Sequence, residues 1–243
     1  MTTRRLISTF LASITLFSAA AAQPTADVAR KAERFFSQHE WASAMAMYGL
    51  MISEKPDDIN SYAHAIVAAG MLDAPAEQLD LTTRAIHAAV PFDSLFARVE
   101  RISFSLAQTS LYRDYLLRVC DAQPWMARHI DGQLLRYYTY RRDPAGMIAY
   151  SRLMLEGMPG HTAFLYPLAQ GLLLNGQPEE AMKVYTDILT SEPHSLEALL
   201  YLGNYFADRA ASHPADRQIA RDYLERAAAL RPTPYLASRL SRL

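Results

Sequence analysis

Prolines recur along this chain at a nearly constant interval. The positions are Pro56, Pro91, Pro124, Pro159, Pro193 and Pro232, and the widest interval is the last one. A period of roughly 34 residues, as found here, is typical of an array of helix–turn–helix units, each packed only against its neighbours. The scarcity of glycine, with 9 in 243 residues, also favours helix. The sequence therefore predicts an all-α repeat protein in which each proline marks the end of one unit.

The clearest unit runs from residue 162 to residue 193. Apolar residues with helical spacing cover residues 164–173, and Asn175-Gly176 is typical of a helix end, because glycine tolerates a left-handed backbone. Pro178 suits the first position of a second helix, where its missing N–H costs nothing. We therefore expect two helices joined by a short turn.

The residue types in this unit resemble those of the tetratricopeptide repeat. The first helix carries a small residue, and the second carries a small, an aromatic and an apolar residue before the proline: Ala169, Ala181, Tyr185, Ile188 and Pro193. The same offsets before Pro56 give Ala32, Ala44, Tyr48 and Met51, and the offsets before Pro232 give Ala220, Leu224 and Ala227. Small residues let two helices cross closely, and a large one fills the hole beside them.

The three middle units fit this pattern less well. Their second helices carry, at the same offsets, Leu79, Thr83 and Ile86, then Tyr112, Leu116 and Val119, then Met147, Ser151 and Met154. The resemblance implies a right-handed αα superhelix of about six units that forms one domain over residues 23–243. We expect a longer inter-helix loop over residues 208–217 and a closing helix over residues 235–243, with a polar outer face.

Residues 1–22 have the layout of a secretory signal. Arg4 and Arg5 precede a short apolar segment over residues 6–17, and Ala20-Ala21-Ala22 provides a small-residue cleavage site before Gln23. The apolar segment is shorter than the roughly 20 residues of a membrane-spanning helix. We expect an exported protein without a membrane span after cleavage, located in the periplasm, with secretion as the alternative. A retained membrane anchor is the other interpretation of this segment.

Composition and motifs argue against several functions. The net charge of −1 gives no basic excess for nucleic-acid binding. The seven histidines show no H-E-x-x-H or similar metal-ligand spacing, and the sequence has no phosphate-binding or nucleophile motif. The one cysteine, Cys120, allows no internal disulfide and is expected to be a small core residue. We therefore expect no catalytic residues, no metal and no cofactor.

The resemblance implies that first helices line a concave groove in which peptides bind. The groove positions it selects include Glu33 and Phe36, and we predict that the partner-binding residues are Arg98, Arg136, Tyr140, Tyr166, Gln170 and Asn204. The densest patch covers residues 136–142, because arginine and tyrosine dominate binding hot spots. This patch has a second interpretation, in which Tyr137 and Tyr138 pack inside while Arg141 and Arg142 cap a helix end.

These patterns predict a non-enzymatic, exported adaptor that holds a protein or peptide in its groove, in cell-envelope assembly or secretion. One alternative is an envelope glycan hydrolase, or a helper subunit of one, which needs two carboxylates facing each other across a cleft. The acids of the first helices are scattered over different units: Glu33, Glu100, Asp131, Glu197 and Asp208. Another alternative is a self-assembling structural protein. The sequence names no partner, pathway or oligomeric state.

Overall fold

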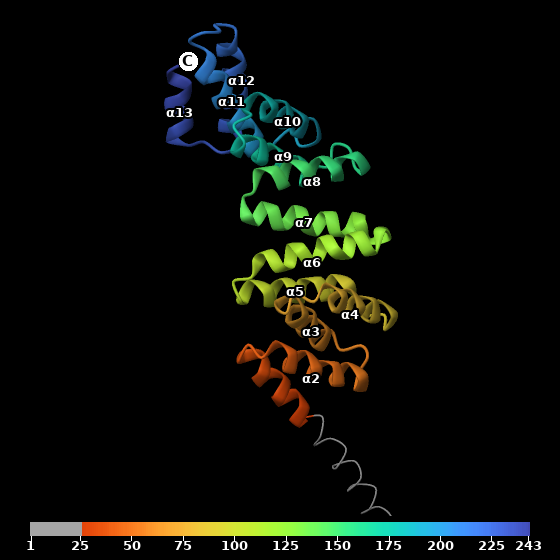
Figure 1. Cartoon of the computed structure of the whole chain (residues 1–243). Coiled ribbons are helices and arrows are strands. Elements are labelled where there is room, and N and C mark those ends of the chain that lie inside the picture. Colours follow the sequence, from red (N-terminus) through yellow and green to blue (C-terminus); the bar gives the residue numbers. More distant parts are fainter. Residues whose placement is uncertain (1–25) are drawn as a thin grey trace, which may run out of the picture. The chain divides into compact units, whose positions relative to one another are not determined.

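The structure, a computed structural model, describes residues 26–243, and within that range it contains helices and turns but no strand (Figure 1). A helix over residues 26–37 comes first. The remaining elements are α2 (Trp41–Glu54), α3 (Ile59–Met71), α4 (Pro75–His87), α5 (Phe92–Ser105), α6 (Thr109–Ala122), the 3₁₀ turn η1 (Pro124–Met126), α7 (Ala127–Arg141), α8 (Pro144–Gly157), α9 (Thr162–Leu174), α10 (Pro178–Ser191), α11 (Leu196–Arg209), α12 (Asp216–Leu230) and α13 (Pro234–Ser241).

The helices pair as the proline period predicts. All six recurring prolines lie between one hairpin and the next helix, and Pro75, Pro144, Pro178 and Pro234 begin helices at the position where an N–H is dispensable. The all-α repeat architecture is confirmed. The last hairpin has the longer loop that we expected, over residues 210–215 between α11 and α12, and α13 is the closing helix.

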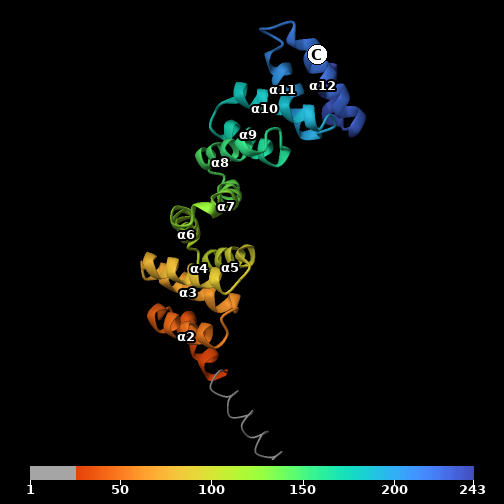
Figure 2. The same ribbon diagram turned by 90° about the vertical axis from the view of Figure 1, so that its right-hand side faces the viewer.

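The described part of the chain divides into two compact units, one that ends at Met126 and one that begins at Ala127. In the first unit α3 lies at the centre, because it packs against α2, α4, α5 and α6 (Figure 2). Nearly every side chain of α3 from Ser61 to Ala69 is buried, which is the pattern of a helix covered on all sides. Phe96 and Tyr115 are also fully buried and meet edge to face at 5.9 Å between ring centroids.

The second unit stacks α7 to α13 around two apolar clusters. One joins α9, α10 and α11 through Leu168, Leu172, Val184 and Leu202, among others. The other joins α11, α12 and α13 through residues such as Leu199, Leu224 and Leu236. The residues of the repeat pattern are buried here: Ala169, Ala181, Tyr185, Ile188, Ala220 and Ala227. All of them except Ala220 belong to one of these two clusters.

The register of α4 differs from the sequence pattern by one residue. The offsets before Pro91 select Leu79, Thr83 and Ile86, whereas the buried residues of α4 are Gln78, Leu81, Thr82 and Ala85. The reason is the place of the proline, because Pro91 is the N-cap of α5. Pro56, Pro159 and Pro193 instead lie three residues before their next helix. The offsets select buried residues in α6 and α8.

The signal sequence that we expect over residues 1–22 lies outside the described residues. Across residues 26–243, none of the helices combines the length and the apolar character needed to cross a bilayer.

Candidate partner-binding groove

A groove runs between the two first helices α7 and α9 of the second unit. Its volume is about 450 Å³, and we call it the α7–α9 groove. Five lining residues come from α7 and three from α9: Gly132, Leu135, Arg136, Thr139, Tyr140, Ala163, Phe164 and Pro167. Most of the lining is apolar, and Arg136 and Tyr140 provide the large polar side chains. Tyr140 is 69% exposed. Such a groove suits an apolar side chain with a polar group beside it.

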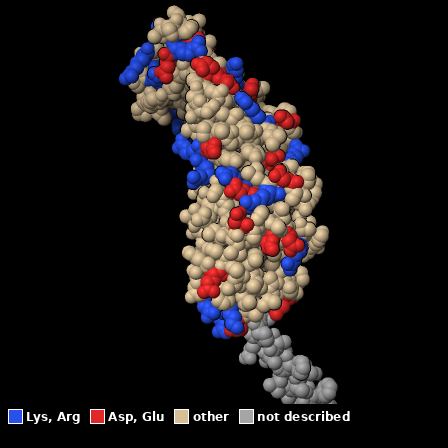
Figure 3. Space-filling model, viewed as in Figure 1, with Lys and Arg blue, Asp and Glu red and all other residues tan. Residues whose placement is uncertain are grey.

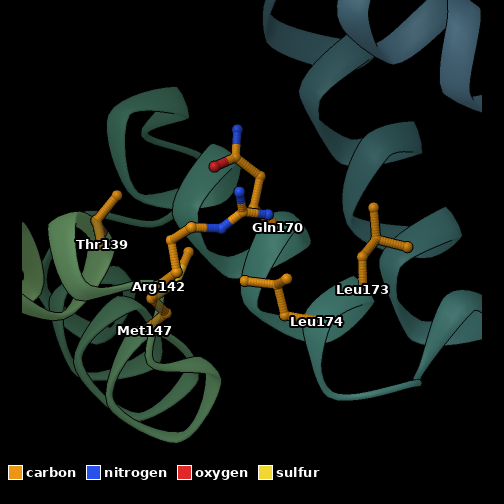
Figure 4. Close-up of a pocket in the computed structure, with 6 residues that line it drawn as sticks. All are labelled: Thr139, Arg142, Met147, Gln170, Leu173 and Leu174. Carbon is orange, nitrogen blue, oxygen red and sulfur yellow. The ribbon is translucent and has the colours of Figure 1, made fainter.

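A second hollow, of about 410 Å³, continues from the same place. Thr139 lines both hollows, and the others lining this one are Arg142, Met147, Gln170, Leu173 and Leu174. In Figure 4 the Arg142 and Gln170 side chains extend toward each other from α7 and α9. The residues that line the two hollows include two arginines and no carboxylate. The electrostatics of this combined surface therefore favour an anionic ligand.

The remaining tyrosines of the 136–142 patch pack inward. Tyr137 is buried, and Tyr138 is half-buried and stacks on Tyr150 of α8 at 5.4 Å. A Cβ on Gly146 would collide with the Tyr138 ring, so this glycine is what lets α8 approach α7. Within the patch, the structure thus assigns Tyr137 and Tyr138 to the interior, and Arg136, Tyr140 and Arg142 to the hollows.

Tyr166 and Gln170 of α9 are held by carboxylates that follow α10. The Tyr166 hydroxyl donates to a carboxylate oxygen of Glu192 at 2.8 Å and contacts the Ser195 hydroxyl at 2.6 Å. The Gln170 amide donates to Glu197 at 3.3 Å, and the Tyr185 hydroxyl donates to the same oxygen at 3.0 Å. Burial raises the pKa of Tyr166, so its hydroxyl keeps the proton that it donates. Of the two predicted site residues on α9, Gln170 lines a hollow, while Tyr166 fastens α9 to the α10–α11 connection.

Asn204 is engaged by the closing helix. Its side-chain oxygen accepts hydrogen bonds from the Tyr235 hydroxyl at 2.7 Å and from Arg239 Nε at 2.9 Å, and Arg239 also pairs with Asp208. Helix α13 therefore contacts α11 at Asn204. Asn204 makes this internal contact, and its role in partner binding stays a prediction.

Arg98 lies in the first unit, on α5, and is half-buried. Its charge acts on His64 of α3, whose ring stacks on Tyr48 at 4.9 Å and meets Phe36 edge to face at 4.9 Å. Burial is the main cause that lowers the pKa of His64, and Arg98 lowers it further. Arg98 thus lies near an aromatic cluster of the first unit that contains His64.

The first unit also has a polar hollow of about 280 Å³ between α3 and α6. Asp73, Asp114 and Arg118 line it, but Asp114 forms an ion pair with Arg113 at 2.7 Å, and Arg118 donates to the buried Gln78 at 2.8 Å. The charged groups of Asp114 and Arg118 therefore make contacts within the protein. Among residues 26–243, no group of three or more His, Cys, Asp or Glu side chains has an arrangement that could hold a metal ion.

Comparisons with known proteins extend these observations. No family model and no curated protein sequence matches this chain. Solved structures do match it. The C-terminal part of a TPR repeat-containing protein from Cytophaga hutchinsonii is 17% identical with a TM-score of 0.47, over 83% of this chain and 78% of that one. YrrB, described as a TPR protein with an unusual peptide-binding site, is 16% identical with a TM-score of 0.33, over 87% and 89% of the two chains.

A third match is the TPR2AB domain of yeast Sti1 in a complex with pHSP90. It is 12% identical with a TM-score of 0.37, over 91% of this chain and 98% of that one. The helical hairpins of this chain repeat at the interval of its prolines, and this interval is the period of the tetratricopeptide repeat. The protein is an all-α array of TPR-like hairpins.

Pro167 and Leu174 are among the lining residues that were not selected from the sequence. Arg142 belongs to the 136–142 patch but not to the predicted partner-binding residues. It follows the last residue of α7 and has a left-handed backbone, with φ 52°, so a helical offset does not give the direction of its side chain. Pro167 occupies the interior of a helix, which a proline seldom does, and that anomaly was the available signal. On the face drawn in Figure 3, acidic and basic side chains are interspersed.

Proposed function

We propose that this protein is a non-enzymatic scaffold that binds a partner protein through a peptide segment of that partner. The binding surface consists of the α7–α9 groove and the adjoining second hollow, which Arg142 lines. The bound segment carries acidic residues beside an apolar one. The single observation that carries this proposal is the lining of the two hollows, which combines apolar side chains with Arg136 and Arg142 and includes no carboxylate.

The charge of the lining sets the kind of ligand. An arginine binds a carboxylate through two parallel hydrogen bonds, and this contact is roughly twice as strong as a neutral hydrogen bond. Apolar residues such as Phe164 and Leu174 supply surface that a ligand side chain can remove from water, at about 25 cal/mol per Å². An acidic segment with one apolar anchor satisfies both requirements.

The site of action that we propose is the cell envelope. The support is the layout of residues 1–22, with two arginines, a short apolar segment and an alanine-rich cleavage site. A partner with an acidic segment exposed in the periplasm is the expected ligand, during assembly of the envelope or secretion.

Peptide titration tests the binding proposal. The chain is titrated by fluorescence anisotropy with a blocked, labelled acidic peptide that contains one aromatic residue, and with the same peptide in which lysine replaces each acid. We expect the acidic peptide to bind more tightly, and Arg136→Glu to weaken its binding at least tenfold. Equal affinity for the two peptides would refute the proposal.

Arg217→Glu is the matched control. Arg217 is exposed on α12, a second helix, so this variant makes the same change of charge away from the two hollows. Its affinity should stay within about twofold of the parent, since exposed charges more than a Debye length of about 10 Å apart are largely screened. Equal losses in Arg136→Glu and Arg217→Glu would mean that only overall charge matters.

A further inference from the structure

A proline in the interior of α9 leaves a main-chain carbonyl oxygen beside the groove as a hydrogen-bond acceptor. Pro167 is the sixth residue of a helix that begins at Thr162. In a regular helix the N–H of residue 167 would donate to the carbonyl oxygen of residue 163, one turn earlier. Proline has no N–H, so the Ala163 oxygen lacks the donor that a helix interior supplies.

This carbonyl belongs to an exposed residue that lines the groove. Helix carbonyls point toward the C-terminus, so the Ala163 oxygen is directed toward Pro167. Both residues line the α7–α9 groove, and Ala163 is exposed. The mostly apolar lining therefore contains one main-chain acceptor, and a ligand with a matching N–H or O–H donor gains a hydrogen bond there.

Charge and shape narrow the choice of donor. Lysine and arginine carry donors, but Arg136 on the opposite wall of the groove would repel them. Serine, asparagine and glutamine offer little apolar surface to a groove of about 450 Å³. Tryptophan has a large apolar ring with a single N–H donor and no acceptor that would need a partner of its own. Its ring is also the best aromatic partner for an arginine guanidinium.

We infer that the α7–α9 groove recognises a tryptophan side chain flanked by acidic residues, with the indole N–H donating to the carbonyl oxygen of Ala163. This inference rests on the proposed function, because it specifies which residue the groove selects from an acidic peptide. Arg136 and Arg142 bind the flanking carboxylates, and the ring lies against Phe164 and Pro167.

The test replaces the N–H donor of the indole by a methyl group. The full chain is titrated by calorimetry with acetyl-Asp-Asp-Trp-Asp-Asp-amide and with the same peptide carrying 1-methyltryptophan, whose ring lacks the N–H. We expect methylation to weaken binding about fivefold, the effect of one net hydrogen bond of about 1 kcal/mol. Equal affinities for the two peptides would overturn the inference while leaving the proposed function intact.

Pro167→Ala supplies the matched protein variant. Alanine restores an N–H that bonds to the Ala163 oxygen, so this variant should bind the two peptides equally. A fivefold preference for the unmethylated ring that persists in Pro167→Ala would also overturn the inference. If the parent chain binds neither acidic peptide, the inference and the proposed function both fail.

Discussion

At the scale of single residues, five of the hairpin turns share a left-handed backbone conformation at one position. Five residues with positive φ lie between the two helices of successive hairpins, one in each: His39, Asp73, Ala107, Arg142 and Gly176. The last of them is a glycine. A side chain in the left-handed region costs roughly 1–2 kcal/mol, so the other four turns are strained.

Replacing Ala107 by glycine should relieve this strain. Ala107 has φ 58°. Because glycine also increases the entropy of the unfolded chain, by about 0.4–1 kcal/mol, we expect a net stabilisation of about 0.5–1 kcal/mol. Urea denaturation followed by circular dichroism measures it. The matched control is Ala97→Gly in the interior of α5, which should destabilise by about 1 kcal/mol. Destabilisation by both variants would contradict the inference that the backbone of Ala107 is strained.

His64 should make folding stability depend on pH. Burial lowers its pKa in the folded state below the usual value of 6.5, so the unfolded chain binds the proton more readily. The stability contributed by neutral His64 is complete above pH 6.5 and is lost as the pH falls toward the lower folded pKa. Glu33, Asp58 and Arg98 are the charges that act on the ring.

The variant His64→Phe isolates this effect. Phenylalanine keeps an aromatic ring against Phe36 and Tyr48 but cannot take up a proton. Thermal unfolding at pH 7.5 and pH 5.5 should show a smaller loss of stability on acidification in His64→Phe than in the parent. An identical loss in both would assign the pH dependence to other groups.

At the scale of elements, close helix crossings depend on particular small residues. A Cβ on Gly203 of α11 would lie 2.6 Å from Leu224 Cδ2 and 3.3 Å from the Leu224 backbone nitrogen of α12. Gly203→Ala should therefore push the two helices apart and destabilise the second unit by about 1–3 kcal/mol. Gly49→Ala is the control, since a Cβ there meets nothing within 4 Å and should stabilise α2 by about 0.5–1 kcal/mol. Urea denaturation gives both values.

The helices also show which structural features the sequence patterns predicted and which they did not. The proline period and the small–aromatic–apolar spacing predicted the hairpins, because both follow from the local sterics of helix ends and crossings. The register of α4 was wrong by one residue, because the place of Pro91 within its loop depends on how α4 ends. Buried Gln78 could not be foreseen either, since it requires Gly70 beside it, the Ile66 carbonyl and Arg118 from α6 as partners.

The candidate site shows the same difference between features set by the local sequence and features set by distant parts of the chain. Arg136, Tyr140 and Gln170, which were selected by helical offset, line the two hollows. The contacts of Asn204 could not be foreseen, because its side chain accepts hydrogen bonds from α13, which comes two elements later in the chain. The direction of the Arg142 side chain could not be foreseen either, because a turn backbone, and not a helical offset, sets it.

At the scale of the whole molecule, the proposed export predicts where the mature chain begins. The full-length chain, produced in a bacterium, should be recovered from the periplasm with residue 23 as its first residue, because a signal is removed after its small-residue site. Intact-mass measurement of the periplasmic fraction tests this. A variant with Ala20 and Ala22 both changed to arginine should accumulate uncleaved. A parent chain that keeps residue 1 and stays with the membrane would contradict cleavage.

Site-specific photocrosslinking tests the central claim, that the α7–α9 groove holds a partner, most directly. A photoreactive benzoylphenylalanine replaces Tyr140 in the full chain within cells, and in a control it replaces Ile219, which is exposed on α12. We predict that Tyr140 crosslinks to one protein, through a peptide containing Asp or Glu that mass spectrometry identifies, and that Ile219 does not. Crosslinking of the same partner from Ile219 but not from Tyr140 would contradict the account and place binding on the second helices.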